Sequence, residues 1–341
     1  MRDIKIITTT GYGCTGSSAV SDLIKEFKSI HTSNTHSVWL LQDFNGISDL
    51  EFSLTDGNHR SKTNLAIKNF WEFANKNKKI YQSTFGKQFL EITRNYINNL
   101  VDVRFRKQIM YEEIKNSQIK FFLFKIYPKI QRFFFYITKF IGLNKNKIFI
   151  AKFPYINKTY TVPNKKKFYK LTQKYLINLI KNIKTKKKIN LFYFDQLVPS
   201  INSQRYLNYF KKIKIIIIDR DPRDLYILNK EKWHGDYALC DTTNVEEFVL
   251  WYKKIREHRD LERENKKIIY INFEDLIYNY EREIKKITKF FNIPKKDHVF
   301  KKKFFKPEIS MKETKTWEIY EDYKKEIKFI EKKLPNYCYK Y

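Results

Sequence analysis

The sequence has few cysteines, which can crosslink a fold, and few glycines and prolines, which favour turns and interrupt helices and strands. Of its 341 residues only 3 are cysteine, and glycine and proline number 8 each. The cysteines, Cys14, Cys240 and Cys338, are too scattered for a disulfide framework or a paired metal motif, which suits a reducing compartment. No run reaches the ~18 uncharged apolar residues that a membrane-spanning helix needs. A strand expected from residue 3 leaves no room for a signal peptide, so we expect a cytoplasmic protein.

Acidic residues are also in short supply. The chain holds 37 Asp and Glu against 68 Lys and Arg, which gives a formal charge of +31. Such a charge is typical of proteins that bind nucleic acid. Lysine, asparagine, isoleucine, phenylalanine and tyrosine are all abundant, however, as they are in proteins from AT-rich genomes whatever the function. We therefore attribute the charge to composition and expect no nucleic-acid partner, with selection for some anionic partner as the alternative.

Alternating apolar runs and helical periodicities predict an α/β fold with right-handed crossovers. Several of the expected strands are near-continuous apolar runs, which is typical of parallel strands covered on both faces. With 341 residues the chain can bury a full core, and we expect one domain over 1–341. Strands are expected at 3–9, 36–42, 148–153, 189–195, 213–219 and 268–273. Helices are expected at 19–29, 63–76, 88–100, 168–183, 244–264, 279–291 and 321–333.

The segment from 78 to 145 differs from the rest of the chain. It is helical in pattern and rich in basic and aromatic residues, above all at 121–128 and 133–136. We expect a helical insertion at 78–145 that packs against the main sheet as a cap and shapes an acceptor cleft. Peripheral membrane contact through an amphipathic helix at 119–140 is the alternative, since Lys and Arg alternate there with aromatic residues.

A β-branched strand, a glycine-rich turn and a helix follow one another at the start of the chain. Such a turn points backbone N–H groups and the positive end of the helix dipole into one concavity, where phosphate-like oxyanions bind. The spacing from Gly11 to Gly16 fits a P-loop, but Ser17 stands where a nucleoside-triphosphate site carries lysine. The missing lysine favours another kind of anhydride donor. A plain strand-to-helix connection is the alternative.

A second motif follows the four isoleucines at 215–218. Arg220 ends this strand, where a buried guanidinium is costly unless it meets an anion. Pro222 suits the first turn of a following helix. Ligands of open α/β sheets bind beyond the carboxyl ends of the strands, which is where both motifs fall. The alternative for the arginine is an internal ion pair with one of three nearby aspartates, Asp219, Asp221 and Asp224.

Four stretches, in this order, resemble the sulfotransferase family, which transfers a sulfuryl group from 3′-phosphoadenosine 5′-phosphosulfate (PAPS). Residues 13–18 resemble the family's 5′-phosphosulfate loop, and residues 216–224 resemble its 3′-phosphate strand and helix start. Residues 270–279, with the helix after them, resemble the Tyr-Glu-Asp-Leu segment before a Phe-Leu-Gly-type helix end. Residues 306–314 resemble the late loop that closes over the nucleotide. The four stretches span nearly the whole chain.

This resemblance, together with the alternation of elements, implies a P-loop NTPase-like three-layer fold with a mainly parallel sheet and an inserted helical cap. It implies PAPS as donor and no metal, because the transferred group carries less charge than a phosphoryl group. We expect the acceptor to be a carbohydrate or glycolipid of a bacterial surface, since an aromatic-rich cleft can stack sugars. The implied donor-binding residues are Gly13, Cys14, Thr15, Gly16, Ser17, Ser18, Arg220 and Lys312.

In-line attack of an acceptor hydroxyl or amine on sulfur depends mostly on positioning and charge neutralisation, but a base should accept the proton. The family places this base, a Glu or His, near the end of the second strand. Asp43, after the strand expected at 36–42, is therefore our first candidate, and His59, in a later loop, is the second. Asp195 closes the strand expected at 189–195 and could bind acceptor hydroxyls. A satisfied loop residue is the alternative for each.

Two departures from the family pattern bear on the donor contacts. Many members have Lys or Arg where Cys14 stands, to neutralise the leaving phosphate. The usual serine eight residues after the family arginine is Leu228 in this sequence. Lys152 and Lys312 are candidates to supply the missing charge, and an inactive relative of the family fits the same departures.

Two other functions remain open at this point. A P-loop kinase or NTPase would need the absent lysine and a clear magnesium aspartate. A basic protein that binds nucleic acid or a membrane surface would account for the charge and the aromatic residues. That second alternative leaves the two phosphate motifs unexplained.

Overall fold

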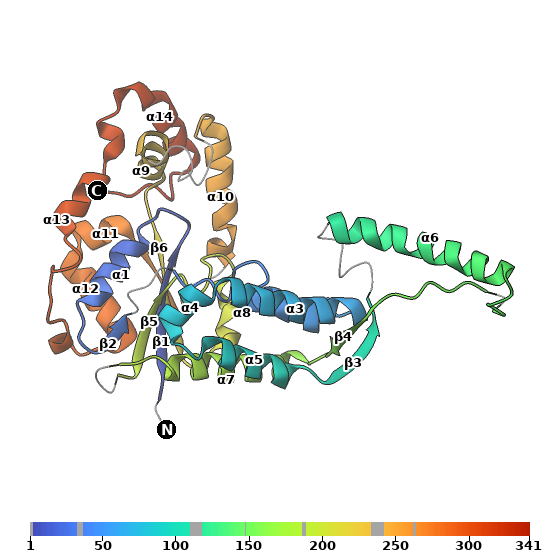
Figure 1. The fold of residues 1–341 in the computed structure, drawn as a ribbon. Helices are drawn as coiled ribbons and strands as arrows, with labels where there is room; N and C mark the ends of the chain where they lie inside the picture. Colours follow the sequence, from blue (N-terminus) through green and yellow to red (C-terminus); the bar gives the residue numbers. More distant parts are fainter. Residues whose placement is uncertain are drawn as a thin grey trace.

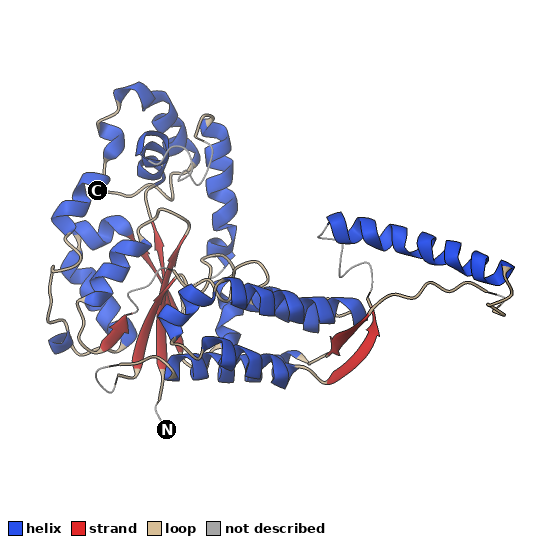
Figure 2. Cartoon of the chain, viewed as in Figure 1, coloured by secondary structure: helices blue, strands red, loops and turns tan. Residues whose placement is uncertain are grey.

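A five-stranded parallel sheet, in the order β2-β5-β1-β6-β7, forms the centre of the structure, which is a computed structural model (Figure 1). Helices cover both faces of this sheet (Figure 2). The strands are β1 Lys5–Gly11, β2 Ile30–Thr32, β5 Leu191–Asp195, β6 Ile213–Asp219 and β7 Ile268–Asn272. The structure describes residues 3–32, 37–109, 118–146, 148–185, 189–232, 242–261 and 264–341.

The isoleucines of β6 show how the two faces of the sheet are buried. Ile215 and Ile217 join the apolar core on one face, whereas Ile216 and Ile218 join the core on the other. All four side chains are fully buried, as expected for a central parallel strand. The predicted three-layer α/β fold with a parallel central sheet is therefore confirmed.

The helices divide into three groups by the core that they join. On one face of the sheet lie α1 Ser17–Lys25, α11 Phe273–Tyr278 and α12 Tyr280–Phe291. On the other lie α2 Ile47–Thr55, α3 Arg60–Lys76, α4 Lys78–Phe85, α5 Phe89–Leu100, α7 Lys165–Lys181 and α8 Ser203–Tyr206. Beyond the carboxyl ends of the strands, α9 Pro222–Ile227, α10 Val245–Leu261 and α14 Lys324–Lys333 share a third core. The short α13 Pro307–Ser310 precedes α14.

Strand register brings the two phosphate motifs together. β1 lies between β5 and β6, with Thr9 opposite Asp195 and Gly11 opposite Ile218. Because all three strands are parallel, the glycine-rich loop, Asp195 and Arg220 leave the sheet at the same edge. This is the edge at which ligands of open α/β sheets bind.

The strand expected at 36–42 is wrong. Residues 33–36 lie outside the described residues, and the chain from Ser37 onward runs through turns into α2. Leu40 and Leu41 are fully buried, but they reach the core from these turns. The edge strand is instead the three-residue β2, which pairs with β5. The apolar residues at 36–42 thus indicated burial correctly, but they did not indicate a strand.

The strand expected at 148–153 is also wrong. These residues have no sheet partner, and the strand begins only at β4 Tyr155–Tyr160, which pairs in antiparallel fashion with β3 Val103–Gln108. Asn64 of α3 accepts a 2.9 Å hydrogen bond from the backbone N–H of Thr159 and so ties this small second sheet to the helices.

Helix α6 Gln118–Phe140 projects away from the central sheet, so the expected packing against that sheet is wrong (Figure 1). No residue of α6 is buried. The helix packs instead on the chain that returns from it, where Phe124 stacks on Phe153 at a ring distance of 4.3 Å. The earlier part of the segment 78–145 behaves differently, because α5 lies in the main core and Tyr96 bonds Thr172 of α7 at 2.8 Å. That 78–145 is one insertion in a single domain stays a prediction.

In the described part of the chain, no helix combines the length and the apolar character that crossing a bilayer requires.

Candidate functional site

The glycine-rich loop between β1 and α1 turns through left-handed backbone conformations. Gly13, Cys14 and Gly16 have φ angles of 91°, 50° and 105°. A Cβ at Gly16 would lie 2.5 Å from Cδ2 of Phe273, so only glycine fits between the loop and this ring. Gly16 is also the N-cap of α1. Since the first N–H groups of a helix have no intrahelical acceptor, the loop presents the positive end of α1 to any ligand above it.

Thr15 ties the loop to the neighbouring strand. Its hydroxyl accepts a 3.1 Å hydrogen bond from the N–H of Tyr12 and donates a 2.9 Å bond to the carbonyl of Ile218. The side chain is buried, and these two bonds hold the loop against the end of β6. The expected contact of Thr15 with a donor would therefore use its backbone N–H.

Arg220 connects the loop with the late loop before α14. Its guanidinium carbon lies 4.4 Å from the ring centre of Phe273, and its Nη1 donates to the carbonyl of Cys14 at 3.5 Å. Its Nη2 donates to the carbonyl of Glu313, whose carboxylate lies 3.8 Å from Nη1. The side chain is only 2 % exposed, but it lines a cavity. A buried cation thus lies directly beside the glycine-rich loop.

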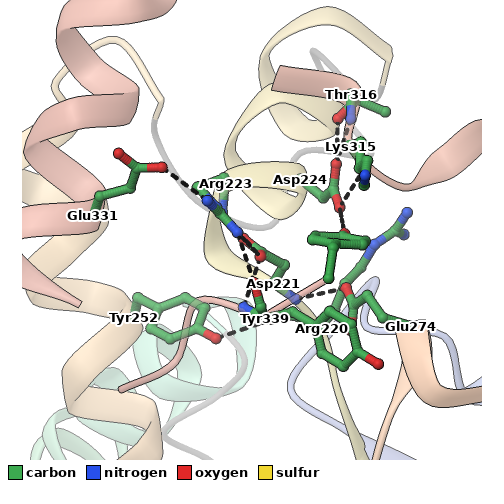
Figure 3. A network of polar contacts seen from close by, with 11 residues as sticks. Arg220, Asp221, Arg223, Asp224, Tyr252, Glu274, Lys315, Thr316, Glu331 and Tyr339 are labelled. Atoms are coloured by element: carbon green, nitrogen blue, oxygen red, sulfur yellow. Dashed lines mark hydrogen bonds and ion pairs between the residues drawn. The ribbon is translucent and has the colours of Figure 1, made fainter. Parts of the chain in front are cut away.

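The three aspartates near Arg220 have other roles, which Figure 3 shows for Asp221 and Asp224. Burial alone would raise the pKa of Asp219, but the neighbouring guanidinium groups outweigh it and hold that pKa below its ordinary value. The carboxylates are held by other partners: Asp219 by Arg256 and Arg259, Asp221 by Arg223, and Asp224 by the N–H and hydroxyl of Thr316. The geometry therefore does not favour the alternative that Arg220 is buried in order to form an ion pair with one of these aspartates.

A cavity of about 680 Å³ opens over the loop. This volume lies within the range of ordinary small-molecule sites. It is lined by five of the eight expected donor-binding residues, together with a basic aromatic segment, Lys303–Lys306, and two acids, Asp22 and Glu313. The five are Cys14, Gly16, Ser17, Ser18 and Arg220.

Lys303 and Lys306 are exposed cations in the cavity wall that sequence reasoning missed as a source of charge. The sequence signal was the basic run at 301–306, which leads into the late loop. Glu26, the C-cap of α1, anchors the segment that carries them, because its fully buried carboxylate accepts the N–H groups of Phe304 and Phe305, each at 3.1 Å. Burial of this kind requires a hydrogen-bonded carboxylate, so the segment is fixed to the helix that starts at the loop.

The remaining expected contacts lie elsewhere. Gly13 forms the bend of the loop but is not in the wall of this cavity. Lys312 is exposed, also outside the wall, and its role as a donor contact stays a prediction. Lys152 accompanies α6, where its N–H donates to Gln131 at 2.9 Å, so it does not supply the charge missing at Cys14.

Asp195 ends β5, Asp43 lies in the turn before α2, and His59 is exposed just before α3. Asp195 accepts a 2.8 Å hydrogen bond from Ser37, and burial raises its pKa. The next residue, Gln196, donates its amide to the hydroxyl of Ser17 at 3.3 Å and accepts a 2.5 Å bond from Gln42. The strand end with Asp195, the turn with Asp43 and the loop with Ser17 are thus connected. None of these three candidate catalytic residues lines the cavity described above.

Glu274 supports the start of α9 from below (Figure 3). Its Oε1 accepts a 2.9 Å hydrogen bond from the N–H of Asp221. Burial raises the pKa of Glu274 from 4.5 to about 8 and that of Asp224 from 3.8 to about 6. Both carboxyl groups are therefore protonated over a wider pH range in the folded than in the unfolded protein.

We expect Glu274→Gln to flatten the pH dependence of stability. A native pKa of about 8 against an ordinary 4.5 means that the folded state holds a proton that the unfolded state releases. The associated stability is complete below the unfolded pKa and lost as pH rises through the folded pKa. Glutamine cannot ionise, so the melting temperature of Glu274→Gln should fall less than that of the wild type between about pH 5 and pH 8. Glu281→Gln, at an exposed glutamate of α12, is the control, and parallel curves for all three proteins would contradict the assignment.

Within the described residues, no group of three or more His, Cys, Asp or Glu side chains is placed to hold a metal ion.

Comparison with known proteins gives only distant similarity. No protein-family model matches the sequence, and no curated protein does. Three similar solved structures each have a TM-score of 0.34. They are a sulfotransferase domain from the curacin biosynthetic pathway (12% identity, covering 88% of this chain and 78% of that one), the sulfotransferase STF9 from Mycobacterium avium (10%, 88% and 67%) and retinol dehydratase in complex with androsterone and inactive cofactor PAP (13%, 98% and 82%). Similarity at this level assigns no activity.

Proposed function

We propose that the protein is a sulfotransferase that moves a sulfuryl group from PAPS to a hydroxyl of a carbohydrate. One observation carries the proposal: an oxyanion loop without the P-loop lysine shares a cavity with a buried arginine from the adjacent strand. A nucleoside triphosphate has its anionic groups in one chain, whereas PAPS carries them on two sides of its ribose. Two separate anion sites in one cavity suit the second arrangement.

The charge of the residues that line the cavity supports PAPS as the donor. The N–H groups of the loop and the start of α1 would hold the 5′-phosphosulfate, with hydroxyl bonds from Ser17 and Ser18. Arg220 would hold the 3′-phosphate through its planar fork. Lys303 and Lys306 would supply the positive charge that Cys14 does not.

Sulfuryl transfer then follows as an in-line displacement. The acceptor oxygen forms a bond to sulfur while the bond from sulfur to the 5′-phosphate oxygen breaks, and 3′-phosphoadenosine 5′-phosphate (PAP) leaves with the negative charge. The acceptor's proton passes to a carboxylate, for which Asp195 at the end of β5 and Asp43 in the turn before α2 are the candidates. Holding the reactants in line and neutralising the leaving phosphate account for most of the rate.

The carbohydrate part of the proposal is supported by aromatic residues next to Asp43. Trp39 and Phe44 flank this aspartate in its turn and are both exposed. Flat aromatic faces beside a candidate base are suited to stacking on sugar rings. A bacterial surface glycan or glycolipid is the acceptor class that we propose.

Asp195→Asn is expected to lower turnover by about 10²–10⁴-fold while leaving the affinity for PAP unchanged. The amide keeps the size of the carboxyl group but cannot accept the acceptor's proton. Transfer of label from radiolabelled PAPS to cell-surface glycans measures turnover, and calorimetric titration with PAP measures affinity. Asp43→Asn is the matched comparison. Full activity of Asp195→Asn, with loss in Asp43→Asn, would place the base in the turn.

A thermal-shift series tests the function as a whole. The ligands are PAP, ATP with Mg²⁺ and a short oligonucleotide, each added to the full chain. A ligand at a hundred times its dissociation constant should add roughly 2.7 kcal/mol of stability. We expect stabilisation by PAP above all. Stabilisation by ATP with Mg²⁺ but not by PAP would favour a kinase, and stabilisation by the oligonucleotide alone would favour a nucleic-acid-binding protein.

A further inference from the structure

Helix α6 and the chain that returns along it form an arm that leaves the body of the molecule (Figure 1). We define this arm as residues 118–154. One side of α6 is covered within the arm, since Phe124 stacks on Phe153 and the rings of Phe135 and Phe149 lie 5.6 Å apart. Gln131 reinforces the contact with two hydrogen bonds to the backbone of Lys152.

The opposite side of α6 is an exposed apolar stripe. Its members recur at spacings of three, four and eight residues, which places them on one face of a helix. Their exposed fractions run from 40% to 93%. The stripe consists of Ile119, Phe122, Ile130, Phe133, Ile137 and Phe140. A contiguous apolar surface of this kind on a protein marks a site that another apolar surface covers.

The charge of the arm is of one sign. Residues 118–154 contain eight Lys or Arg and no Asp or Glu. Five of the eight belong to α6 itself, and the helical spacing places Lys125 and Lys129 along one border of the apolar stripe. The ammonium group of Lys125 lies 4.4 Å from the ring centre of Phe121, one turn earlier on α6. The apolar stripe is therefore bordered by positive charge.

We propose that α6 binds the surface of an anionic lipid bilayer. The stripe would enter the boundary between headgroups and acyl chains, and the bordering lysines would contact the lipid phosphates. An amphipathic helix with a basic polar face is suited to this position, whereas the lysines along α6 prevent it from spanning the membrane. A nucleic acid would satisfy the lysines but leave the aliphatic and aromatic stripe in water.

This inference does not depend on the proposed sulfotransferase activity. The stripe and the residues that line the cavity over the loop come from different elements and have no member in common. Failure of vesicle binding would leave the PAP proposal unaffected, and failure of PAP binding would leave the membrane proposal unaffected.

Co-sedimentation of the full chain with lipid vesicles tests the proposal. We expect binding to vesicles that contain phosphatidylglycerol, weaker binding to pure phosphatidylcholine, and a decrease in binding as salt is raised. Phe133→Ser should weaken binding to the anionic vesicles at least tenfold, since one buried phenylalanine contributes that much. Because no residue of α6 is buried, the substitution should leave the fold and PAP binding unchanged.

Phe52→Ser, which changes an exposed phenylalanine of α2, is the matched control and should bind vesicles like the wild type. The double variant Lys125→Gln/Lys129→Gln should bind anionic vesicles at least tenfold more weakly than the wild type, and its binding to phosphatidylcholine should change little. Equal binding by Phe133→Ser and Phe52→Ser would overturn the proposal. So would a dimer that dissociates in Phe133→Ser without any vesicle binding, because a second copy would then cover the stripe. Loss of oligonucleotide binding in the lysine variant, with vesicle binding intact, would overturn it in favour of a nucleic acid.

Discussion

Replacing Arg220 with alanine is expected to abolish measurable binding of PAP. The guanidinium is almost fully buried between the ring of Phe273 and the carbonyl groups of Cys14 and Glu313, at the wall of the cavity. Each hydrogen bond from such a cation to a phosphate contributes about 1.5–3 kcal/mol. Loss of a two-bond fork should therefore weaken binding by 100-fold or more, which calorimetric titration of PAP measures.

Two further variants make this result interpretable. Arg220→Lys keeps the charge without the planar fork and should weaken binding by about tenfold. Arg94→Ala, which removes an arginine of α5 that lies over Trp71 and does not line the cavity, should bind PAP like the wild type. Thermal unfolding without ligand shows whether each variant is folded. Unchanged affinity in a folded Arg220→Ala would refute the role that we give this residue.

Among the variants that we propose, Arg256→Ala should lower the free energy of unfolding most. Arg256 is fully buried and donates to both oxygens of Asp219, at 2.6 Å and 2.9 Å, while its guanidinium lies against the ring of Tyr252. Removing it leaves a buried carboxylate with a weakened set of partners directly before Arg220. Breaking a buried ion pair on one side costs about 3–5 kcal/mol, which urea unfolding at neutral pH measures.

The control for this loss is Arg282→Ala. Arg282 also pairs with an aspartate, Asp275, at 2.7 Å, but its side chain is 62% exposed. An exposed pair of this kind is screened by solvent and adds little to stability. If Arg256→Ala and Arg282→Ala lowered the free energy of unfolding by similar amounts, the buried pair of Arg256 and Asp219 would not be what fixes the end of β6.

The sequence predicted the centre of the fold better than its edges. The isoleucine run became β6 because a strand buried on both faces needs apolar residues at every position, and few other elements produce that pattern. The edge strand β2 has only three residues, which is too short for any alternation to be visible. The residues of β3 and β4 pair across the whole arm, and local composition carries no information on such distant pairing.

The candidate site was predicted in part. Loop residues such as Ser17 and the strand-end Arg220 could be placed because parallel strands bring their carboxyl ends to one edge. The role of Thr15 could not be predicted in this way. A threonine in a phosphate-type loop suggests a ligand contact, but the hydroxyl of Thr15 bonds the carbonyl of Ile218 and so holds the loop in place. Lys303 and Lys306 were missed because only tertiary packing, through the buried Glu26, brings their segment over the loop.

The account rests on one nucleotide lying between the loop and Arg220, and a crystal structure of the protein with PAP tests this most directly. We predict that the 5′-phosphate lies on the N–H groups at the start of α1 and that the 3′-phosphate lies within about 4 Å of the guanidinium of Arg220. A nucleotide with both phosphates on the loop, and Arg220 still bound to the carbonyl of Glu313, would contradict the account.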